Sequence, residues 1–156
     1  MFKLAEYLPP FPNATWTLAR QSGVTHAVSN IPPDGPECPG WDYLPLLRMK
    51  TRFADAGLTL EVIETGFPWL HAAKLGLPGA EAEIERAETL LRNLGAVGVP
   101  VVCWNWMAGF NWTRTSTTTI GRGGALVTAY DHELMKGAPF TADGEVSDER
   151  LWESLA

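Results

Sequence analysis

The sequence predicts an α/β fold made of successive βα units, roughly the first four units of an eight-stranded (β/α)8 barrel. Short apolar runs suited to strands alternate along the chain with stretches of helical periodicity. A glycine separates each helical stretch from the next apolar run, at residues 23–25 (GVT), 57–59 (GLT) and 98–100 (GVP). Because glycine readily adopts the left-handed conformation that ends a helix, this weak repeat indicates three helix-to-strand junctions.

The first unit is predicted to begin with a strand over residues 2–8. The proline-rich run at residues 9–12 ends this strand, because proline cannot donate a hydrogen bond to the β-ladder. Asn13 then suits the N-cap of a helix, since its side chain can accept a bond from the first free backbone N–H groups. One face of this helix carries Trp16, Ala19 and Arg20.

The second unit is predicted as a strand over residues 25–30, a proline- and glycine-rich loop over 32–40, and a helix that ends at Gly57. Asp42 is the expected N-cap of this helix, and Pro45 is tolerated in its first turn. The core-facing positions follow the spacing i, i+3 and i+7, at Leu46, Met49 and Phe53.

The third and fourth units are predicted from a strand over residues 58–63, a loop over 65–79, a helix over 80–94 and a strand over 99–103. The buried stripe of that helix is expected to be Ile84, Ala87, Leu91 and Leu94. Its solvent-facing side is expected to carry Glu81, Glu83, Glu85 and Arg86. The strand over 99–103 is expected to be central in the sheet and buried on both faces.

A long irregular connection is expected from residue 108 to 145, with 125–130 as a candidate short strand. Ser147 then suits the N-cap of a last helix, which shows no stop signal before Ala156. Residues 1–156 are therefore interpreted as the N-terminal half of a single barrel domain, interrupted in its fourth helix. The alternative is a complete four-stranded α/β domain with a frayed terminus.

Composition excludes several function classes. The net charge is −6 and the basic residues form no cluster, so neither nucleic acid nor an anionic membrane is an expected partner. No apolar run approaches the roughly 20 residues of a membrane span. Cys38 and Cys103 are too few for a disulfide framework, and Cys103 is expected to be buried. A reducing, cytoplasmic setting fits these features.

The stretch over residues 99–115 is the strongest candidate for a functional site. Its apolar strand leads directly into polar and aromatic side chains, at the end of the strand where parallel α/β proteins bind ligands. Asn105 can donate and accept hydrogen bonds, and the guanidinium of Arg114 can fork onto a carboxylate. The aromatic side chains that can pack against a sugar are Trp104, Trp106 and Trp112. The alternative is a core strand followed by an aromatic loop that packs the barrel rim.

Glu64 and His71 are further candidates, because both follow the third predicted strand. A salt bridge explains Glu64 nearly as well, and a surface loop explains His71 equally well. His26 is expected to be structural and His132 to begin a solvated helix. No histidine is spaced with a cysteine, a carboxylate or another histidine in a metal-binding pattern, and residues 121–124 (GRGG) lack the lysine and helix of a phosphate loop.

The run CWNWMAGFNWTRTST at residues 103–117 resembles the signature of mannonate dehydratases, with its C-[YW]-N-[FW]-M and W-[TV]-R-T segments. The similarity continues, in the same order, through most of the chain, at residues 56–65, 91–103, 121–136 and 147–155. The sequence departs from the family pattern at Trp104, at Trp106, at residues 109–111 and in the loop over 66–76.

This resemblance implies a fold similar to the xylose isomerase-like barrels. It implies the dehydration of D-mannonate to 2-keto-3-deoxy-D-gluconate, in hexuronate catabolism, with a divalent metal such as Mn²⁺ or Fe²⁺. The family's metal ligands are two histidines, a cysteine and an aspartate from later strands, and no position here matches them. We therefore expect this chain by itself to bind no catalytic metal and to be inactive.

The residues that the resemblance offers for contact with the acidic sugar are Asn105, Trp112 and Arg114, followed by Glu64 and His71. A homo-oligomer is the expected assembly. Two other functions remain open: a sugar isomerase or epimerase on the same barrel, and a half-barrel that serves only in binding or assembly.

Overall fold

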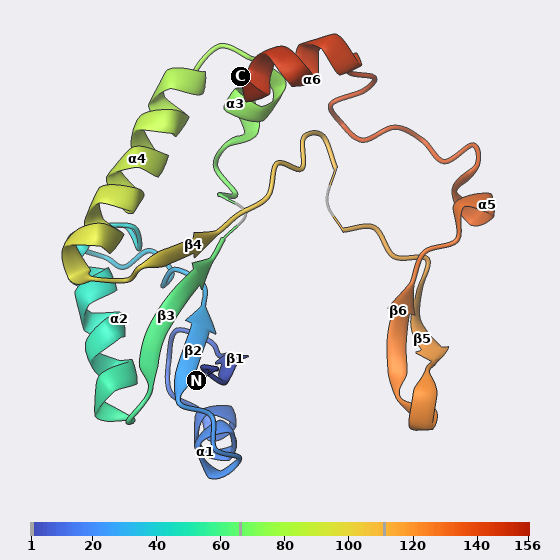
Figure 1. Cartoon of the computed structure of the whole chain (residues 1–156). Coiled ribbons are helices and arrows are strands. Elements are labelled where there is room, and N and C mark those ends of the chain that lie inside the picture. The colour runs from blue at the N-terminus through green and yellow to red at the C-terminus, as the bar shows by residue number, and fades with distance from the viewer. Residues whose placement is uncertain (1, 66, 111) are drawn as a thin grey trace.

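The structure is a computed structural model that describes residues 2–65, 67–110 and 112–156. Its centre is a parallel sheet of four strands, β1 (Ala5–Tyr7), β2 (His26–Ser29), β3 (Thr59–Glu64) and β4 (Val101–Cys103). The strands lie side by side in chain order, as Figure 1 shows. An ordered run of parallel strands joined by helices is the arrangement of a (β/α)8 barrel, so the predicted partial barrel is confirmed.

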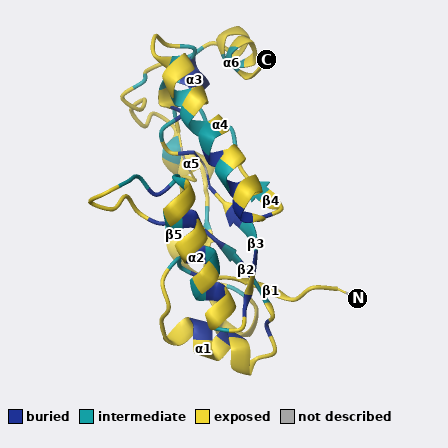
Figure 2. Ribbon diagram, turned by 90° about the vertical axis from the view of Figure 1, so that its left-hand side faces the viewer, coloured by how far each residue is buried: buried dark blue, intermediate teal, exposed yellow. Residues whose placement is uncertain are grey.

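Three helices pack along the sheet and enclose the core: α1 (Ala14–Gln21), α2 (Tyr43–Asp55) and α4 (Ala80–Val97). The predicted positions of α2, Leu46, Met49 and Phe53, are fully buried, and the Phe53 ring stacks on Trp16 of α1 with centroids 4.0 Å apart. Figure 2 shows the buried residues concentrated where these helices meet the strands. On the predicted face of α1, Trp16 and Ala19 are buried. Arg20 on the same face is exposed, and its guanidinium donates a hydrogen bond to the carbonyl of Ala56.

The predicted N-caps of α1 and α2 behave differently. The side chain of Asn13 accepts hydrogen bonds from the backbone N–H groups of Thr15 and Trp16, as expected. Asp42 stands at the N-cap of α2, but its side chain makes no capping hydrogen bond. A physical reason lies in the sequence: the third residue of α2 is Pro45, which removes one of the N–H groups that a cap can bind.

The buried stripe of α4 differs from the predicted one. Leu90, Leu94 and Val97 are buried, whereas Ile84 and Leu91 are both 47% exposed. The helix has two adjacent apolar stripes, and the sheet covers only one of them. The other stripe borders an apolar groove of about 410 Å³ beside Trp104 and Trp106. The helix also continues past residue 94 and ends at Gly98, which has a φ of 75°.

Strand β4 lies at the edge of the sheet, so the prediction of a central strand buried on both faces is wrong. Val101 is 45% exposed and Cys103 is exposed, whereas Val99 just before the strand is buried. The first strand is also shorter than predicted: β1 at the opposite edge covers only Ala5–Tyr7, and Phe2 and Leu4 before it are exposed. An edge strand has only one neighbour, which leaves part of its backbone and one face uncovered.

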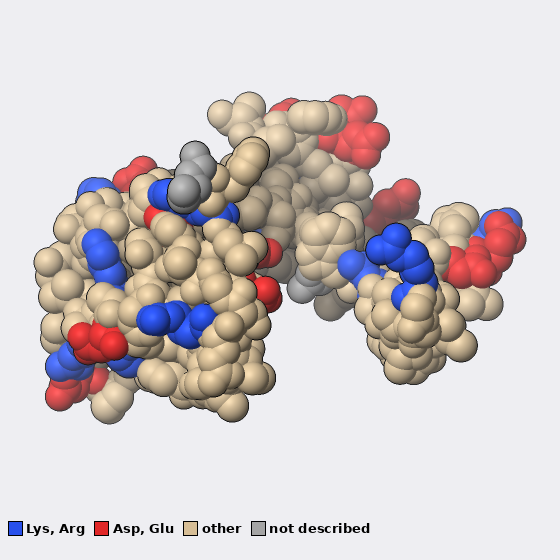
Figure 3. Space-filling view, turned by 60° about the horizontal axis from the view of Figure 1, so that its bottom comes forward, with Lys and Arg blue, Asp and Glu red and all other residues tan. Residues whose placement is uncertain are grey.

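The chain after β4 contains more regular structure than predicted. Strands β5 (Ser116–Ile120) and β6 (Leu126–Ala129) form an antiparallel hairpin around a short 3-10 turn, η1 (Arg122–Gly124). Strand β6 confirms the candidate strand over 125–130, whereas β5 was missed because its sequence, STTTI, is mostly polar. Figures 1 and 3 show this hairpin beside the sheet domain. On the face in Figure 3, basic and acidic residues are interspersed over the larger mass, which is the sheet domain.

Three short helices complete the chain: α3 (His71–Leu75), α5 (His132–Met135) and α6 (Asp148–Leu155). Ser147 caps α6 by accepting a hydrogen bond from the N–H of Arg150, as predicted. Helix α5 begins at His132, also as predicted, whereas α3 lies in a segment that we expected to be a loop. Within the described ranges, no helix combines the length and the apolarity that crossing a bilayer requires.

Candidate functional site

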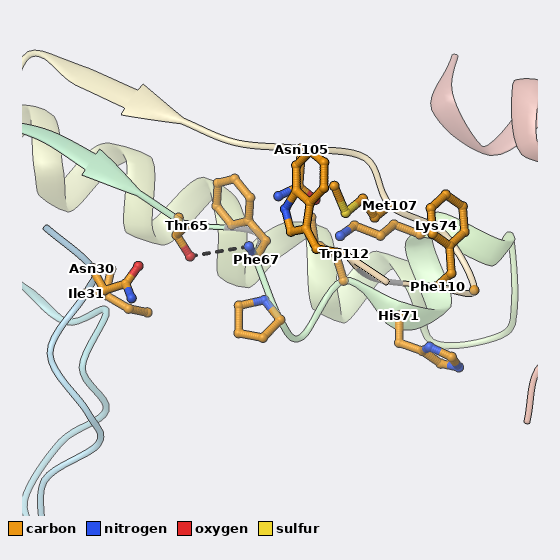
Figure 4. A pocket seen from close by; sticks show the side chains of 13 residues that line it. Asn30, Ile31, Thr65, Phe67, His71, Lys74, Asn105, Met107, Phe110 and Trp112 are labelled. Atoms are coloured by element: carbon orange, nitrogen blue, oxygen red, sulfur yellow. Dashed lines mark hydrogen bonds between the residues drawn. The ribbon is translucent and has the colours of Figure 1, made fainter. Parts of the chain in front are cut away.

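A cavity of about 550 Å³ opens at the carboxyl ends of the central strands. Asn30 follows β2 directly, Thr65 follows β3 directly, and Asn105 lies two residues beyond β4. Helix α3 contributes His71 and Lys74, as Figure 4 shows. A glycine and several apolar and aromatic groups complete the described lining: Ile31, Phe67, Pro68, Leu70, Met107, Gly109, Phe110 and Trp112. This edge of a parallel sheet is where α/β proteins bind their ligands.

Thr65 and Phe67 follow β3 at this edge of the sheet. The N–H of Thr65 continues the ladder by donating to the carbonyl of Cys103, at 2.9 Å. The Thr65 hydroxyl then accepts a hydrogen bond from the N–H of Phe67, at 3.3 Å (Figure 4). Phe67 adopts a φ of 45°, which is unfavourable for a residue with a side chain. Helix α3 follows these residues and forms one wall of the cavity.

Helix α3 is held by contacts from two other helices. The N–H of Ala73 donates to the Glu83 carboxylate of α4 at 2.8 Å, so Glu83 is not the solvent-facing residue we expected. From α6, the Ser154 hydroxyl donates to the carbonyl of Lys74 at 2.8 Å. The Arg150 guanidinium, also on α6, donates to the carbonyls of Leu75 and Gly76. These bonds fix the backbone from which His71 and Lys74 project.

The cavity carries positively charged or chargeable groups. Lys74 is only 8% exposed, and its burial lowers the pKa of its ammonium below the usual value for lysine. His71 pairs with Asp143, whose carboxylate lies 3.2 Å from the imidazole. The described residues that line the cavity include no aspartate or glutamate. Such a lining favours an anionic ligand over a cationic one.

An aromatic cluster lies beside the cavity and includes two of the tryptophans that we expected to pack against a sugar. Trp104 and Trp106 meet edge to face, with centroids 5.9 Å apart, and Trp104 also contacts Phe67. Both tryptophans border the apolar groove along α4 and not the cavity. Arg86, predicted to face solvent, stacks over Trp41 at 4.8 Å from the ring centroid. This cluster packs the outer side of the cavity wall.

The structure brings three of the five predicted substrate contacts to the cavity: Asn105, Trp112 and His71. Glu64 is the last residue of β3 and lies outside the described lining. Burial raises the pKa of the Tyr7 phenol, and the negative charge of Glu64 raises it further. Arg114 also lies outside the described lining. Its guanidinium stacks over Trp112, donates to the Thr128 hydroxyl at 3.1 Å and donates to the carbonyl of Thr113.

Sequence reasoning missed Thr65 and Lys74 as site residues. Thr65 belongs to no recognisable sequence motif. It reaches the carboxyl edge of the sheet because it directly follows β3. Lys74 had one signal, because it is a cation flanked by apolar residues in the run LHAAKLGL. That run was interpreted as a loop, and a lysine in a loop is ordinarily exposed. Gly66 and Asn111, which belong to the departures from the family pattern, lie outside the described residues.

The parallel strands in chain order, with a polar and aromatic cavity at their carboxyl ends, define an α/β-barrel protein of the kind that binds small polar ligands. The family model for D-mannonate dehydratase (UxuA) matches residues 12–150. The chain therefore belongs to the D-mannonate dehydratase family.

Individual relatives agree with this assignment. The chain is 39% identical to the mannonate dehydratase of Thermotoga maritima over 98 residues, which cover 62% of this chain and 27% of that protein. It is 39% identical to the mannonate dehydratase of Streptococcus suis strain 05ZYH33 over 93 residues, 60% of this chain and 24% of that protein. The crystal structure of mannonate dehydratase from Streptococcus suis serotype 2 superposes with a TM-score of 0.79 at 28% identity. That superposition covers 99% of this chain and 47% of the solved chain, so this chain spans about half the length of that relative.

Proposed function

We propose that this chain forms the part of a mannonate dehydratase that binds the acidic sugar. The reaction would convert D-mannonate to 2-dehydro-3-deoxy-D-gluconate and water, within hexuronate catabolism. The observation that carries this proposal is the cavity at the carboxyl ends of β2, β3 and β4. It offers hydrogen-bonding groups, an aromatic face and a buried cation, in a chain that belongs to this family.

Each lining group suits one part of a six-carbon sugar acid. The Asn105 amide can donate to one hydroxyl and accept from another, and Asn30 offers the same groups from the end of β2. The Trp112 ring can pack against the C–H face of the carbon chain. His71 provides a further ring nitrogen at the wall that α3 forms. These contacts would orient the substrate but do not themselves break a bond.

The dehydration requires removal of the proton next to the carboxylate and loss of hydroxide from the neighbouring carbon. The divalent metal that the family resemblance implies, Mn²⁺ or Fe²⁺, would polarise substrate oxygens when bound. The described residues do not fit this metal, because no three histidine, cysteine, aspartate or glutamate side chains gather among them. We therefore assign to these residues only the binding and orientation of the sugar. We also propose that the whole protein is a homo-oligomer.

Nuclear magnetic resonance of the 156-residue chain tests the binding proposal. D-Mannonate should shift the backbone resonances of Thr65 and Asn105 and the indole resonance of Trp112, in a saturable way. D-Mannitol, which has the same carbon skeleton without the carboxylate, should have a weaker effect. Shifts confined to other parts of the chain, or no saturable shift, would contradict the proposal.

A pair of tryptophan variants provides a matched control for the same titration. Trp112→Ala should weaken D-mannonate binding about fivefold, because the aromatic face contributes on the order of 1 kcal/mol. Trp152→Ala on α6 should leave the affinity unchanged, since Trp152 is 71% exposed and lies outside the described lining. A separate assay with Mn²⁺ and D-mannonate should detect no 2-dehydro-3-deoxy-D-gluconate from this chain alone.

A further inference from the structure

Lys74 occupies an unusual position for a lysine. Lysine side chains are rarely buried, yet Lys74 is 8% exposed, between the buried residues Ala73 and Leu75 on α3. It lines the cavity at the carboxyl ends of the strands. Figure 4 shows its side chain extended along the cavity, with the nitrogen directed toward the part that Asn105 and Trp112 line. Lysine side chains more often extend outward so that the ammonium reaches water.

The backbone that carries Lys74 is fixed. Its carbonyl accepts a hydrogen bond from the Ser154 hydroxyl, and the next two carbonyls are bound by Arg150 of α6. On the opposite side, the N–H of Ala73 is bound by Glu83 of α4. Because α3 is tied to two helices, the ammonium is presented to the cavity from an anchored position. A binding group held in advance loses less conformational entropy when a ligand arrives.

The electrostatic surroundings of Lys74 favour a negative ligand. The described lining contains no carboxylate, and the imidazole of His71, three residues before Lys74, pairs with Asp143. Burial disfavours the charged form of Lys74 and lowers its pKa. A carboxylate beside the ammonium would favour the charged form again, because opposite charges attract strongly where water is excluded.

We propose that the ammonium of Lys74 binds the carboxylate of the sugar acid, while Asn105 and Trp112 contact its hydroxyl-bearing carbons. This inference rests on the proposed function for the identity of the sugar acid, but not on any dehydration step. It also differs from the role that the sequence suggested for Arg114. The Arg114 guanidinium donates to Thr113 and Thr128 beside the hairpin, outside the described lining.

The first arm of the test follows the titration of Lys74 in the 156-residue chain, through the ¹³C resonance of its Cε. Saturating D-mannonate should raise the pKa of Lys74 by about 1 or more, the effect of an opposite charge within a few ångströms. D-Mannitol should leave that pKa unchanged. A lysine with only a structural role would respond to neither ligand, so this readout separates the two roles.

The second arm compares variants that keep the length of the stem. Lys74→Met should weaken D-mannonate binding about tenfold or more, because a charge-assisted hydrogen bond is lost. Its affinity for D-mannitol should not fall. Lys74→Arg should retain part of the D-mannonate affinity, since the positive charge remains. The matched control is Lys136→Met, because Lys136 is exposed, pairs with Glu133 and lies outside the described lining of this cavity.

The outcomes distinguish failure of this inference from failure of the proposed function. If D-mannonate binds at Asn105 without changing the pKa of Lys74, or binds Lys74→Met as tightly as the wild type, the Lys74 inference is overturned and the proposed function stands. If D-gluconate or D-glycerate raises that pKa and D-mannonate does not, Lys74 binds carboxylates but the proposed sugar is wrong. If none of these acids raises it, the Lys74 inference is overturned.

Discussion

The imidazole Nε2 of His71 lies 3.2 Å from Oδ1 of Asp143, so the first residue of α3 is tied to the segment that leads into α6. His71 lines the cavity, whereas Asp143 comes from a part of the chain about 70 residues away. The pair therefore connects one wall of the site to the C-terminal segment. Because the His71 side chain is 57% exposed, water screens the interaction.

Asp143→Asn should lower the free energy of unfolding by less than ~1 kcal/mol, the usual range for an exposed ion pair. The amide can still accept a hydrogen bond from the imidazole, which limits the loss further. Urea denaturation followed by circular dichroism measures the change. A loss above ~2 kcal/mol would show that the contact stabilises the C-terminal segment far more than its exposure suggests.

Two adjacent leucines on α4 provide a direct test of the packing. Leu90→Ala should lower the free energy of unfolding by about 2–5 kcal/mol, because Leu90 is fully buried and its loss leaves a cavity. Leu91→Ala should cost less than ~1 kcal/mol, since Leu91 is 47% exposed. Both variants replace leucine by alanine within the same helix, so they change its helix propensity equally. The difference between their denaturant midpoints therefore reports the difference in burial. Equal losses, or a larger loss for Leu91→Ala, would contradict the stripe seen in the structure.

Arg114 should act on the hairpin. Arg114→Ala removes the hydrogen bond to Thr128 and the stacking on Trp112, so amide hydrogen exchange in β5 and β6 should become faster. Arg114→Lys should have a similar effect, because lysine lacks the planar group that stacks and donates in two directions. We expect D-mannonate affinity to stay within about threefold of the wild type, a change of less than ~1 kcal/mol.

The opposite result for Arg114 has a clear meaning. If both variants lose about tenfold or more in D-mannonate affinity while hydrogen exchange in the hairpin stays unchanged, Arg114 binds the substrate, as the sequence suggested. Thr128→Val is the matched variant, because it removes the hydroxyl that Arg114 binds and leaves the guanidinium in place.

The phenol of Tyr7 should titrate above the usual tyrosine value of about 10. Burial raises the pKa of Tyr7 most, and the negative charge of Glu64 adds to it. Glu64→Gln should therefore lower that pKa without returning it fully to the usual value. The ¹³C resonance of the Tyr7 Cζ, followed through an alkaline titration, measures both values, and Tyr43→Phe and Tyr130→Phe confirm the assignment of the signal.

The sign of the accompanying stability change follows from linkage. A raised pKa means that the folded chain keeps its Tyr7 proton at a pH where the unfolded chain has lost it. Stability is therefore unaffected by Tyr7 below the unfolded pKa and falls as the pH rises from there toward the folded pKa. Tyr7 is 46% exposed, so this loss should be small. A Glu64→Gln variant with an unchanged Tyr7 pKa would show that burial alone causes the effect.

The sequence by itself determined the features that depend on local chemistry. Gly23, Gly57 and Gly98 lie within two residues of the ends of α1, α2 and α4, each with a positive φ, because glycine adopts that conformation without steric cost. The Asn13 cap and the buried positions of α2 follow from side-chain reach and from helical periodicity. Asn105 lines the cavity because it comes shortly after a strand of a parallel sheet, and the direction of the strand decides which edge it reaches.

Only the tertiary structure decided the features that depend on what packs against an element. Periodicity places Leu90 and Leu91 on neighbouring apolar stripes, and the way α4 lies on the sheet selects which one is buried. The apolar composition of β4 indicates a strand but does not determine its number of neighbours, so its edge position was missed. Lys74 lines the cavity on α3, which α4 and α6 hold through hydrogen bonds from residues up to 80 positions away. Such long-range contacts leave no periodic signal in the sequence, because each depends on the distance between segments that only folding brings together.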